Sequence, residues 1–421
     1  MSHRSPDLHA ALRLFGLAAF AALQRDVDKG AEVPFAFEEH DARGRTTFYE
    51  FRPLILSFVE SRAERLAELP DARDALNELA REPAATLFAG SLTGGRTGED
   101  AAFETILLPL VARIADARGG FDWDDDLYER EYAELERLLF GSERRHVVVV
   151  PLIGLEVGTV IDLGGGLHAR PFITGELSGP WPESSGLLPE RFAREPDRAA
   201  VLELTHNLAP GATARPDAAA EIADAVTALR LAVGGPLATG PVYFERIDRH
   251  PVGVKPSLPI AAAQPPGEPT RLDVFRGGLA RRLRERVAAV DEDPDLGEAL
   301  DRWELSLFQT EPFRSEQLRT SLDSLLGGGD GIWAAALRAA VLLGESGRER
   351  AEQHARLRPL ADGAEGPDAA DGVRDALVEA LLFGSRDELV AALDESLLGT
   401  RPPPGGRLLA LAAEPAAATA S

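Results

Sequence analysis

The pattern of apolar and polar positions is most regular in the last part of the chain, between Leu296 and Gly399. Leucine, alanine and aromatic residues recur there at steps of three and four, which places them on one face of a helix. Glycines at positions 327–329, 344 and 384 interrupt the pattern and indicate helix ends. Because isolated helices of this length are only marginally stable in water, the pattern predicts a bundle of about five helices that bury these faces together.

Polar residues in front of these stretches predict how the helices begin. Thr310 is expected to cap the second helix, with Pro312 in its first turn, and Asp330 is expected to cap the third. Ser385 and Glu388 have the spacing of a capping box for the last helix. The helices of the bundle are therefore expected to begin at polar capping residues and to end at glycines.

The N-terminal part of the chain shows helical spacing in several separate stretches. Helices are predicted at 10–23, 51–69, 71–79, 102–119 and 128–139, with an irregularity at Pro109. The first stretch is interrupted by Arg13 and is not followed by a small-residue cleavage site, so we expect a core helix rather than a signal peptide. No run of eighteen apolar residues occurs, and no membrane span is expected.

From His146 onwards the pattern becomes typical of strands. Val147–Ile153 is a dense run of β-branched residues and predicts a buried strand. Further strands are predicted at 157–163, 167–173, 200–204 and 242–247, and a helix at 217–233. The proline-rich stretch 251–269 is expected to form a loop or linker.

The predicted fold is therefore α+β and mostly helical. We expect a helical N-terminal region at 1–140, a small mixed α/β domain at 141–270, a helical bundle at 271–400 and a disordered tail at 401–421. A chain of 421 residues is long enough for several cores of ordinary size.

Composition narrows the classes of function. The chain has 69 acidic and 45 basic residues, a formal charge of −24, which opposes non-specific attraction to nucleic acid. Cysteine is absent, so disulfides, thiolate catalysis and cysteine-based zinc sites are excluded. We expect a cytoplasmic protein with no cofactor and no metal.

Three segments of the predicted bundle, 299–304, 318–326 and 337–344, resemble the HEPN (higher eukaryotes and prokaryotes nucleotide-binding) superfamily, in particular its ApeA-like branch. The resemblance implies metal-independent RNA cleavage, in which a histidine acts as general acid or base on the ribose 2′-hydroxyl and an arginine holds the phosphate. It also implies a homodimer with the active site at the shared interface, and a role in defence or in a toxin–antitoxin system.

The segment 357–369, where this motif is expected, contains no histidine, and the nearest candidate catalytic pair is Arg348 with His354. The leading hypothesis is therefore a HEPN-like protein whose catalytic site is degenerate. The alternative is a non-enzymatic interaction or scaffold protein that binds protein partners. A third hypothesis is a small-molecule site in the middle domain, which requires a deep pocket lined by convergent polar groups.

Other motifs have both a functional and a structural interpretation. A basic patch on a predicted helix at 272–290 suits RNA or an acidic partner, or is a charged outer face; its members are Arg276, Arg281, Arg282, Arg284 and Arg286. Residues 90–97 imitate a phosphate-binding loop but are expected to form a flexible loop. The acidic run 122–126 is expected to cap a helix, and glycines 164–166 to form a tight turn. His168 and His206 are isolated and predict no metal site.

Overall fold

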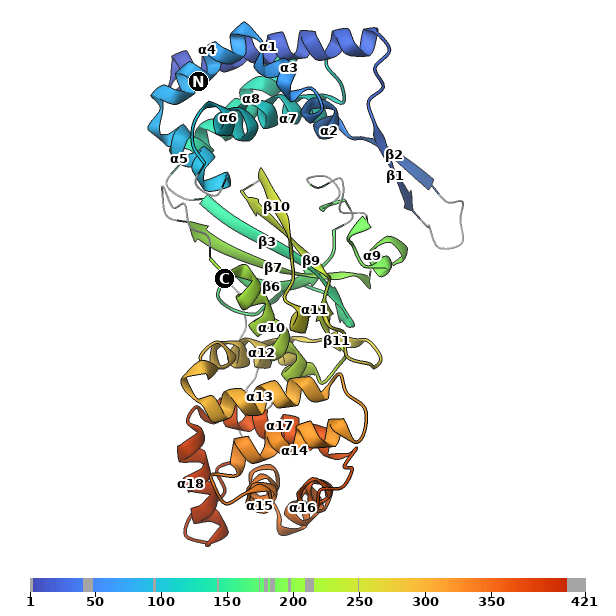
Figure 1. Cartoon of the computed structure of the whole chain (residues 1–421), viewed down its shortest axis with the longest axis vertical. Coiled ribbons are helices and arrows are strands. Elements are labelled where there is room, and N and C mark those ends of the chain that lie inside the picture. The colour runs from blue at the N-terminus through green and yellow to red at the C-terminus, as the bar shows by residue number, and fades with distance from the viewer. Residues whose placement is uncertain are drawn as a thin grey trace.

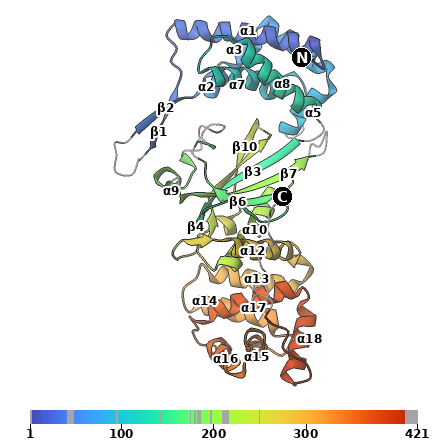
Figure 2. The ribbon, with the colours of Figure 1, turned by 180° about the vertical axis from the view of Figure 1, so that it is seen from behind.

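The computed structural model describes residues 3–40, 48–93, 96–141, 144–173, 175–177, 181, 186–195, 198–208, 216–248 and 250–406. The molecule is elongated, with an N-terminal helical layer, a middle layer built on a β-sheet and a C-terminal helical bundle along its long axis (Figures 1 and 2). The predicted α+β, mostly helical fold class is confirmed.

The N-terminal layer has one apolar core, to which all of its longer helices contribute. These helices are α1 (Pro6–Asp28), α2 (Ile55–Glu60), α3 (Ala63–Ala67), α4 (Pro70–Arg81), α5 (Pro83–Leu92), α6 (Glu99–Ala102), α7 (Leu108–Arg118) and α8 (Asp125–Phe140). Among the described residues, α1 is the one helix long and apolar enough to cross a membrane, and it buries Leu12, Phe15 and Leu23 in this core. The irregularity predicted at Pro109 is a π-helical turn over Phe103–Leu107, just before the proline.

Three predictions for this layer are wrong in detail. Residues 51–53 belong not to a helix but to a hairpin of β1 (Phe35–His40) and β2 (Phe48–Pro53), which projects sideways from the layer (Figure 1). The third predicted helix, α4, begins at Pro70 and not at Asp71. Proline is tolerated there because the backbone N–H groups in the first turn of a helix have no partner within the helix. Gly90 lies inside α5, so the expected loop at 90–97 begins as a helix; residues 94 and 95 lie outside the described residues.

The middle layer contains an antiparallel sheet with the strand order β10-β9-β3-β7-β6-β5. Its strands are β3 (Arg144–Ile153), β5 (Ile161–Asp162), β6 (Leu167–Pro171), β7 (Ala200–Leu208), β9 (Val242–Ile247) and β10 (His250–Pro256), and β8 (Ala238–Thr239) pairs with β3. The short strands β4 (Leu155–Val157) and β11 (Thr270–Leu272) pair in parallel beside it. The single strand predicted at 157–163 is thus divided between β4 and β5.

Both faces of the central strand β3 are covered, which explains its continuous apolar sequence. Helix α10 (Ala218–Val233) packs on the face that carries Val148 and Val150. Trp181 and the short helix α9 (Glu190–Arg194) cover part of the face that carries Val147 and Val149. The other half of that second face points towards the N-terminal layer (Figure 1).

The proline-rich stretch 251–269 is not one loop, as the sequence predicted. It contains the edge strand β10 and the helix α11 (Pro259–Ala262). A strand at the edge of a sheet pairs on one side only and therefore tolerates prolines, and the register shifts between Pro251 and Gly253. Composition alone does not distinguish such an edge strand from a loop.

The C-terminal layer packs the predicted apolar faces into a single cluster. It contains α12 (Val274–Val287), α13 (Pro294–Ser306), α14 (Phe313–Leu326), α15 (Ile332–Leu343), α16 (Gly347–Ala361), α17 (Ala369–Phe383) and α18 (Arg386–Leu397). The region from 294 onwards thus has six helices rather than about five. The predicted boundary at 270 stays a prediction, because α12 supplies Leu279 to this cluster and Ala280 to the core under the sheet. The predicted disordered tail lies outside the described residues from 407 onwards.

Two of the predicted caps have other partners. Thr310 does not cap α14; instead the Glu311 carboxylate accepts hydrogen bonds from the backbone N–H and the hydroxyl of Ser315. Asp330 does not cap α15, because its carboxylate binds the guanidinium of Arg338. The Ser385 side chain accepts from the Glu388 backbone, which is one half of the predicted capping box.

Candidate functional site

The candidate catalytic pair, Arg348 and His354, lies on one helix without mutual contact. Six residues along an α-helix correspond to a rotation that separates two side chains by about 120°. The Arg348 side chain is 90% exposed, and its Nε donates to Oε1 of Glu352 at 2.9 Å. Among the described residues, no hydrogen bond or ion pair joins Arg348 to His354. A single chain therefore does not assemble the arginine–histidine site that the resemblance implies.

The arginines of the basic patch are divided among different contacts. Arg281 forms an ion pair with Asp162 at 2.9 Å, and Arg276 donates to the carbonyl of Arg271 at 3.0 Å. Arg284 lies over the turn between β5 and β6, where a Cβ added to Gly165 would meet its Nη2 at 2.2 Å. Arg286 similarly approaches Gly384, and Arg282 lies on the same helix α12.

The remaining predicted motifs have structural roles. The Asp124 carboxylate accepts from the backbone of Asp126 and Leu127 and caps α8, so the capping interpretation of the acidic run is confirmed. Residues 164–166 form a turn closed by a hydrogen bond from the Leu167 N–H to the Gly164 carbonyl. His168 lies 3.6 Å from Asp162 and His206 3.0 Å from Glu221, in two separate pairs.

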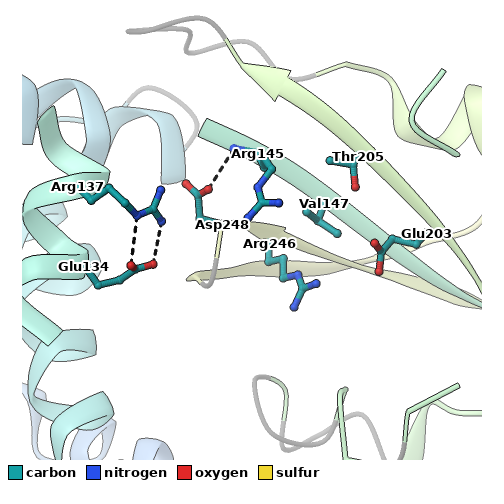
Figure 3. A pocket seen from close by; sticks show the side chains of 8 residues that line it. All are labelled: Glu134, Arg137, Arg145, Val147, Glu203, Thr205, Arg246 and Asp248. Atoms are coloured by element: carbon teal, nitrogen blue, oxygen red, sulfur yellow. Dashed lines mark hydrogen bonds and ion pairs between the residues drawn. The ribbon is translucent and has the colours of Figure 1, made fainter. Parts of the chain in front are cut away.

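A cleft of about 460 Å³ lies between helix α8 and the exposed half of the sheet, and we call it the α8–sheet cleft. Figure 3 shows that its lining comes from four elements, α8, β3, β7 and β9, together with the residue after β9. The lining residues are Glu134, Arg137, Arg145, Val147, Glu203, Thr205, Arg246 and Asp248.

Strand register places the sheet residues of this cleft side by side. Val147 on β3 is directly opposite Thr205 on β7 and Arg246 on β9. Arg145 and Glu203 are each two residues from one of these positions, and side chains two residues apart on a strand share a face. One face of the sheet therefore presents Arg145, Thr205, Glu203 and Arg246 towards α8.

Several charges of the cleft are already paired within the protein. Arg137 donates to both oxygens of Glu134, at 3.2 and 2.8 Å. This bidentate contact raises the pKa of Arg137 above its usual value, and the nearby Asp248 adds to the effect. Glu203 accepts two hydrogen bonds from Arg170 of β6, at 3.0 and 2.7 Å. These groups form the walls of the cleft but are not free to bind a ligand.

The guanidinium groups of Arg145 and Arg246 and one carboxylate oxygen of Asp248 remain without a partner among the described residues. Among the described residues, the buried Nε of Arg246 has no hydrogen-bond partner, and the exposed side chain of Arg145 has none either. Asp248 accepts from the Arg145 backbone through Oδ1, while its buried Oδ2 has no donor among the described residues. Asp248 has a φ of 53°, and among the described residues it is the one non-glycine residue with a positive φ. Such strain is tolerated only where surrounding structure maintains it, and it is enriched at functional sites.

Sequence reasoning did not find this cleft, because its residues lie between positions 134 and 248 and share no motif. The one available signal was the charge at the ends of two strands: Arg144 and Arg145 begin β3, and Arg246 follows Glu245 near the end of β9.

The fold and the cleft define an α+β protein with a polar cleft between a helical layer and an antiparallel sheet. Comparisons of the chain with protein-family models, with curated proteins and with solved structures find no match. The described lining residues of the cleft include no histidine, and its arginines are suited to holding a negatively charged group rather than to moving protons.

Proposed function

We propose that the protein is a non-enzymatic binding protein and that the α8–sheet cleft takes a small molecule with a phosphate or carboxylate group. The observation that carries this proposal is the pair Arg145 and Arg246, whose guanidinium groups have no partner among the described residues. The half-buried guanidinium of Arg246 is unfavourable without a partner, and an anion held between it and the exposed Arg145 relieves this. Planar guanidinium groups match the oxygens of phosphate and carboxylate.

The size and the remaining polar group of the cleft specify the ligand further. A volume of about 460 Å³ lies within the range of small-molecule sites. The unpartnered Oδ2 of Asp248 is an acceptor beside the two arginines. A hydroxyl or amine next to the anionic group of the ligand would satisfy it, so we propose a ligand that carries both.

Isothermal titration of the full chain tests this proposal. Probes are pyrophosphate, citrate and adenosine monophosphate, and the variants are Arg145→Gln and Arg246→Gln. Arg348→Gln is the matched control, because it removes the same charge from an exposed helix outside the cleft. Loss of one charge-assisted contact is expected to weaken anion binding by roughly 10- to 100-fold in the cleft variants and not in the control. The proposal fails if no probe binds, or if both cleft variants bind as tightly as the original chain.

A HEPN-like, cytoplasmic homodimer with residual or lost ribonuclease activity is the second proposal. It is supported by the burial of the leucine and alanine stripes of the resembling segments in one cluster. Because Arg348 and His354 are apart within one chain, this proposal needs a second copy to complete the site. Incubation of the original chain and of a His354→Ala variant with labelled RNA tests this second proposal. If both chains cleave the RNA equally, or neither cleaves it, Arg348 and His354 are not a catalytic pair.

A further inference from the structure

Three potential metal ligands meet where the N-terminal segment crosses α8. Nε2 of His9 lies 2.9 Å from Oε1 of Glu129, and Nε2 of His3 lies 3.4 Å from Oε2 of the same carboxylate. One ligand atom from each of these residues lies within 4.8 Å of the other two. His9 and Glu129 are 120 positions apart in the sequence, so this cluster is a product of the fold.

Aromatic contacts hold the two imidazole rings in place. The rings of His3 and His9 stack with centroids 3.9 Å apart, and the ring of Tyr132 packs edge-on against both. The hydroxyl of Tyr128 donates to the backbone carbonyl of His9 at 2.6 Å. Both tyrosines are buried in the N-terminal core, so one side of the cluster is rigid.

The donor atoms and their separations suit a divalent transition metal. Zinc binds imidazole nitrogen and carboxylate oxygen at about 2.0–2.2 Å in tetrahedral geometry. Two ligands of such an ion are then roughly 3.3–3.5 Å apart, by the tetrahedral angle. The separations of 2.9 and 3.4 Å run from the two imidazoles to different oxygens of the Glu129 carboxylate, and one ligand atom from each residue lies within 4.8 Å of the other two. Rotation of the exposed Glu129 side chain would bring one oxygen to an ion shared with both imidazoles.

The exposure of the cluster leaves room for a fourth ligand. The side chains of His3 and His9 are 21% and 15% exposed, and that of Glu129 is 47% exposed. Solvent therefore reaches the carboxylate side, where water can complete the coordination shell. Two nitrogen donors and one oxygen favour zinc, nickel or copper over magnesium and calcium, which prefer oxygen ligands.

We propose that His3, His9 and Glu129 bind one divalent transition metal ion, with zinc as the natural choice for this donor set. The ion joins the N-terminal segment and the start of α1 to α8, and it stabilises the helical layer because it binds only the folded chain. This proposal is independent of the α8–sheet cleft. It departs from the prediction of no metal, which was made from the sequence without singling out these three residues.

The test uses the full chain without a polyhistidine tag. Zinc chloride is titrated calorimetrically, and thermal unfolding is followed with and without zinc, then after addition of EDTA. The variants are His9→Ala and Glu129→Gln, and His354→Ala is the control because it removes a histidine from a helix outside the cluster. Glu129 is nearly half exposed, so Glu129→Gln tests the site even if His9→Ala disturbs the packing of the tyrosines.

We expect one zinc ion per original chain and per His354→Ala chain, with an EDTA-reversible rise in the unfolding midpoint. Glu129→Gln is expected to bind at least about tenfold more weakly, because loss of even a supporting group weakens metal sites by this factor. Equal zinc binding by the original chain and Glu129→Gln would overturn the proposal. Absence of binding by the original chain, or equally tight binding of magnesium, would also overturn it.

Discussion

At the scale of single residues, charged side chains in this protein are placed by their partners rather than by sequence motifs. Asp26 near the end of α1 accepts hydrogen bonds from Arg62 at 2.9 Å and from Arg65 at 2.8 Å. The hydrogen bond from Arg65, with a further contribution from Arg62, lowers the pKa of Asp26 to about 2. This carboxylate thereby ties α1 to the segment that contains α3.

The lowered pKa of Asp26 predicts an acid-dependent contribution to stability. An acid whose folded pKa is depressed stabilises the fold above its unfolded pKa of about 3.9, and the contribution disappears as the pH falls towards 2. Asp26→Asn should lower the free energy of unfolding at pH 7 by about 1–2 kcal/mol, reduced by the solvent exposure of Arg65. Urea unfolding at pH 7 and pH 2.5 measures this. An undiminished difference at the lower pH, or an equal effect of Asp28→Asn, would contradict it.

At the scale of elements, one arginine organises the end of the bundle. Arg338 on α15 is 3% exposed, and its Nη1 donates to the last carbonyls of α14, those of Leu326 and Gly327. Its Nε and Nη2 bind Asp394 on α18 at 2.7 and 2.9 Å. Helix ends leave carbonyl groups without partners, and here a single guanidinium satisfies two of them while joining three helices.

Arg338→Lys is expected to destabilise the bundle strongly although it keeps the charge. The single ammonium group of lysine lacks the fork geometry of a guanidinium and cannot reach all of these acceptors at once. The carbonyls of Leu326 and Gly327 therefore lose their donor. We expect a loss of about 3–5 kcal/mol in the free energy of unfolding. Arg348→Lys, on an exposed helix face, should stay within about 0.5 kcal/mol. Denaturant unfolding compares the two; a similar effect of both would show that Arg338 has no special structural role.

At the scale of the whole molecule, the middle layer and the bundle are joined through a buried ion pair. Arg230 on α10 donates to Glu304 on α13 at 2.6 Å, and Thr227 donates to the same carboxylate at 2.9 Å. The other donors of Arg230 reach the carbonyls of Leu237, Ile260 and Ala263. Burial raises the pKa of Glu304, although Arg230 opposes this effect. The contact between α10 and α13 therefore depends on a complete polar network.

Removal of one member of this network leaves a buried charge without its partner. Glu304→Gln should therefore lower the free energy of unfolding by about 3–5 kcal/mol and increase hydrogen exchange in α10 and α13. Glu298→Gln on the same helix removes an exposed carboxylate and serves as the control. The double variant Arg230→Met with Glu304→Leu should regain much of the loss, because apolar groups need no partner. Equal effects of Glu304→Gln and Glu298→Gln would refute this account.

The local pattern of the chain was sufficient for most elements. Steps of three and four predicted α10, α13, α15 and α17, and the β-branched run predicted β3. The local pattern failed where contact with another strand or helix decides the conformation. The prolines of β10 suggested a loop, but the partner strand β9 holds them at the edge of the sheet. Asp330 had the properties of a helix cap, but the more distant Arg338 takes its carboxylate.

Neither candidate binding site was accessible to the same reasoning. The α8–sheet cleft depends on the register that places Arg246 opposite Val147, and on the position of α8 above that face. The histidine–glutamate cluster depends on α1 and α8 lying together, which brings His9 to Glu129. Such contacts arise from packing between elements that are far apart in the sequence. The spacing of apolar residues along the chain carries no information about them.

The sequence by itself determined the fold class, the helical bundle and the buried central strand, because helix period, β-branching and helix punctuation act over a few neighbouring residues. The tertiary structure alone decided which charges are paired and which remain free. Arg137, Arg145 and Arg246 are chemically equivalent in the sequence, yet Arg137 binds Glu134 while Arg145 and Arg246 have no such partner among the described residues. Pairing depends on distances between segments far apart in the chain, and only the packed molecule sets those distances.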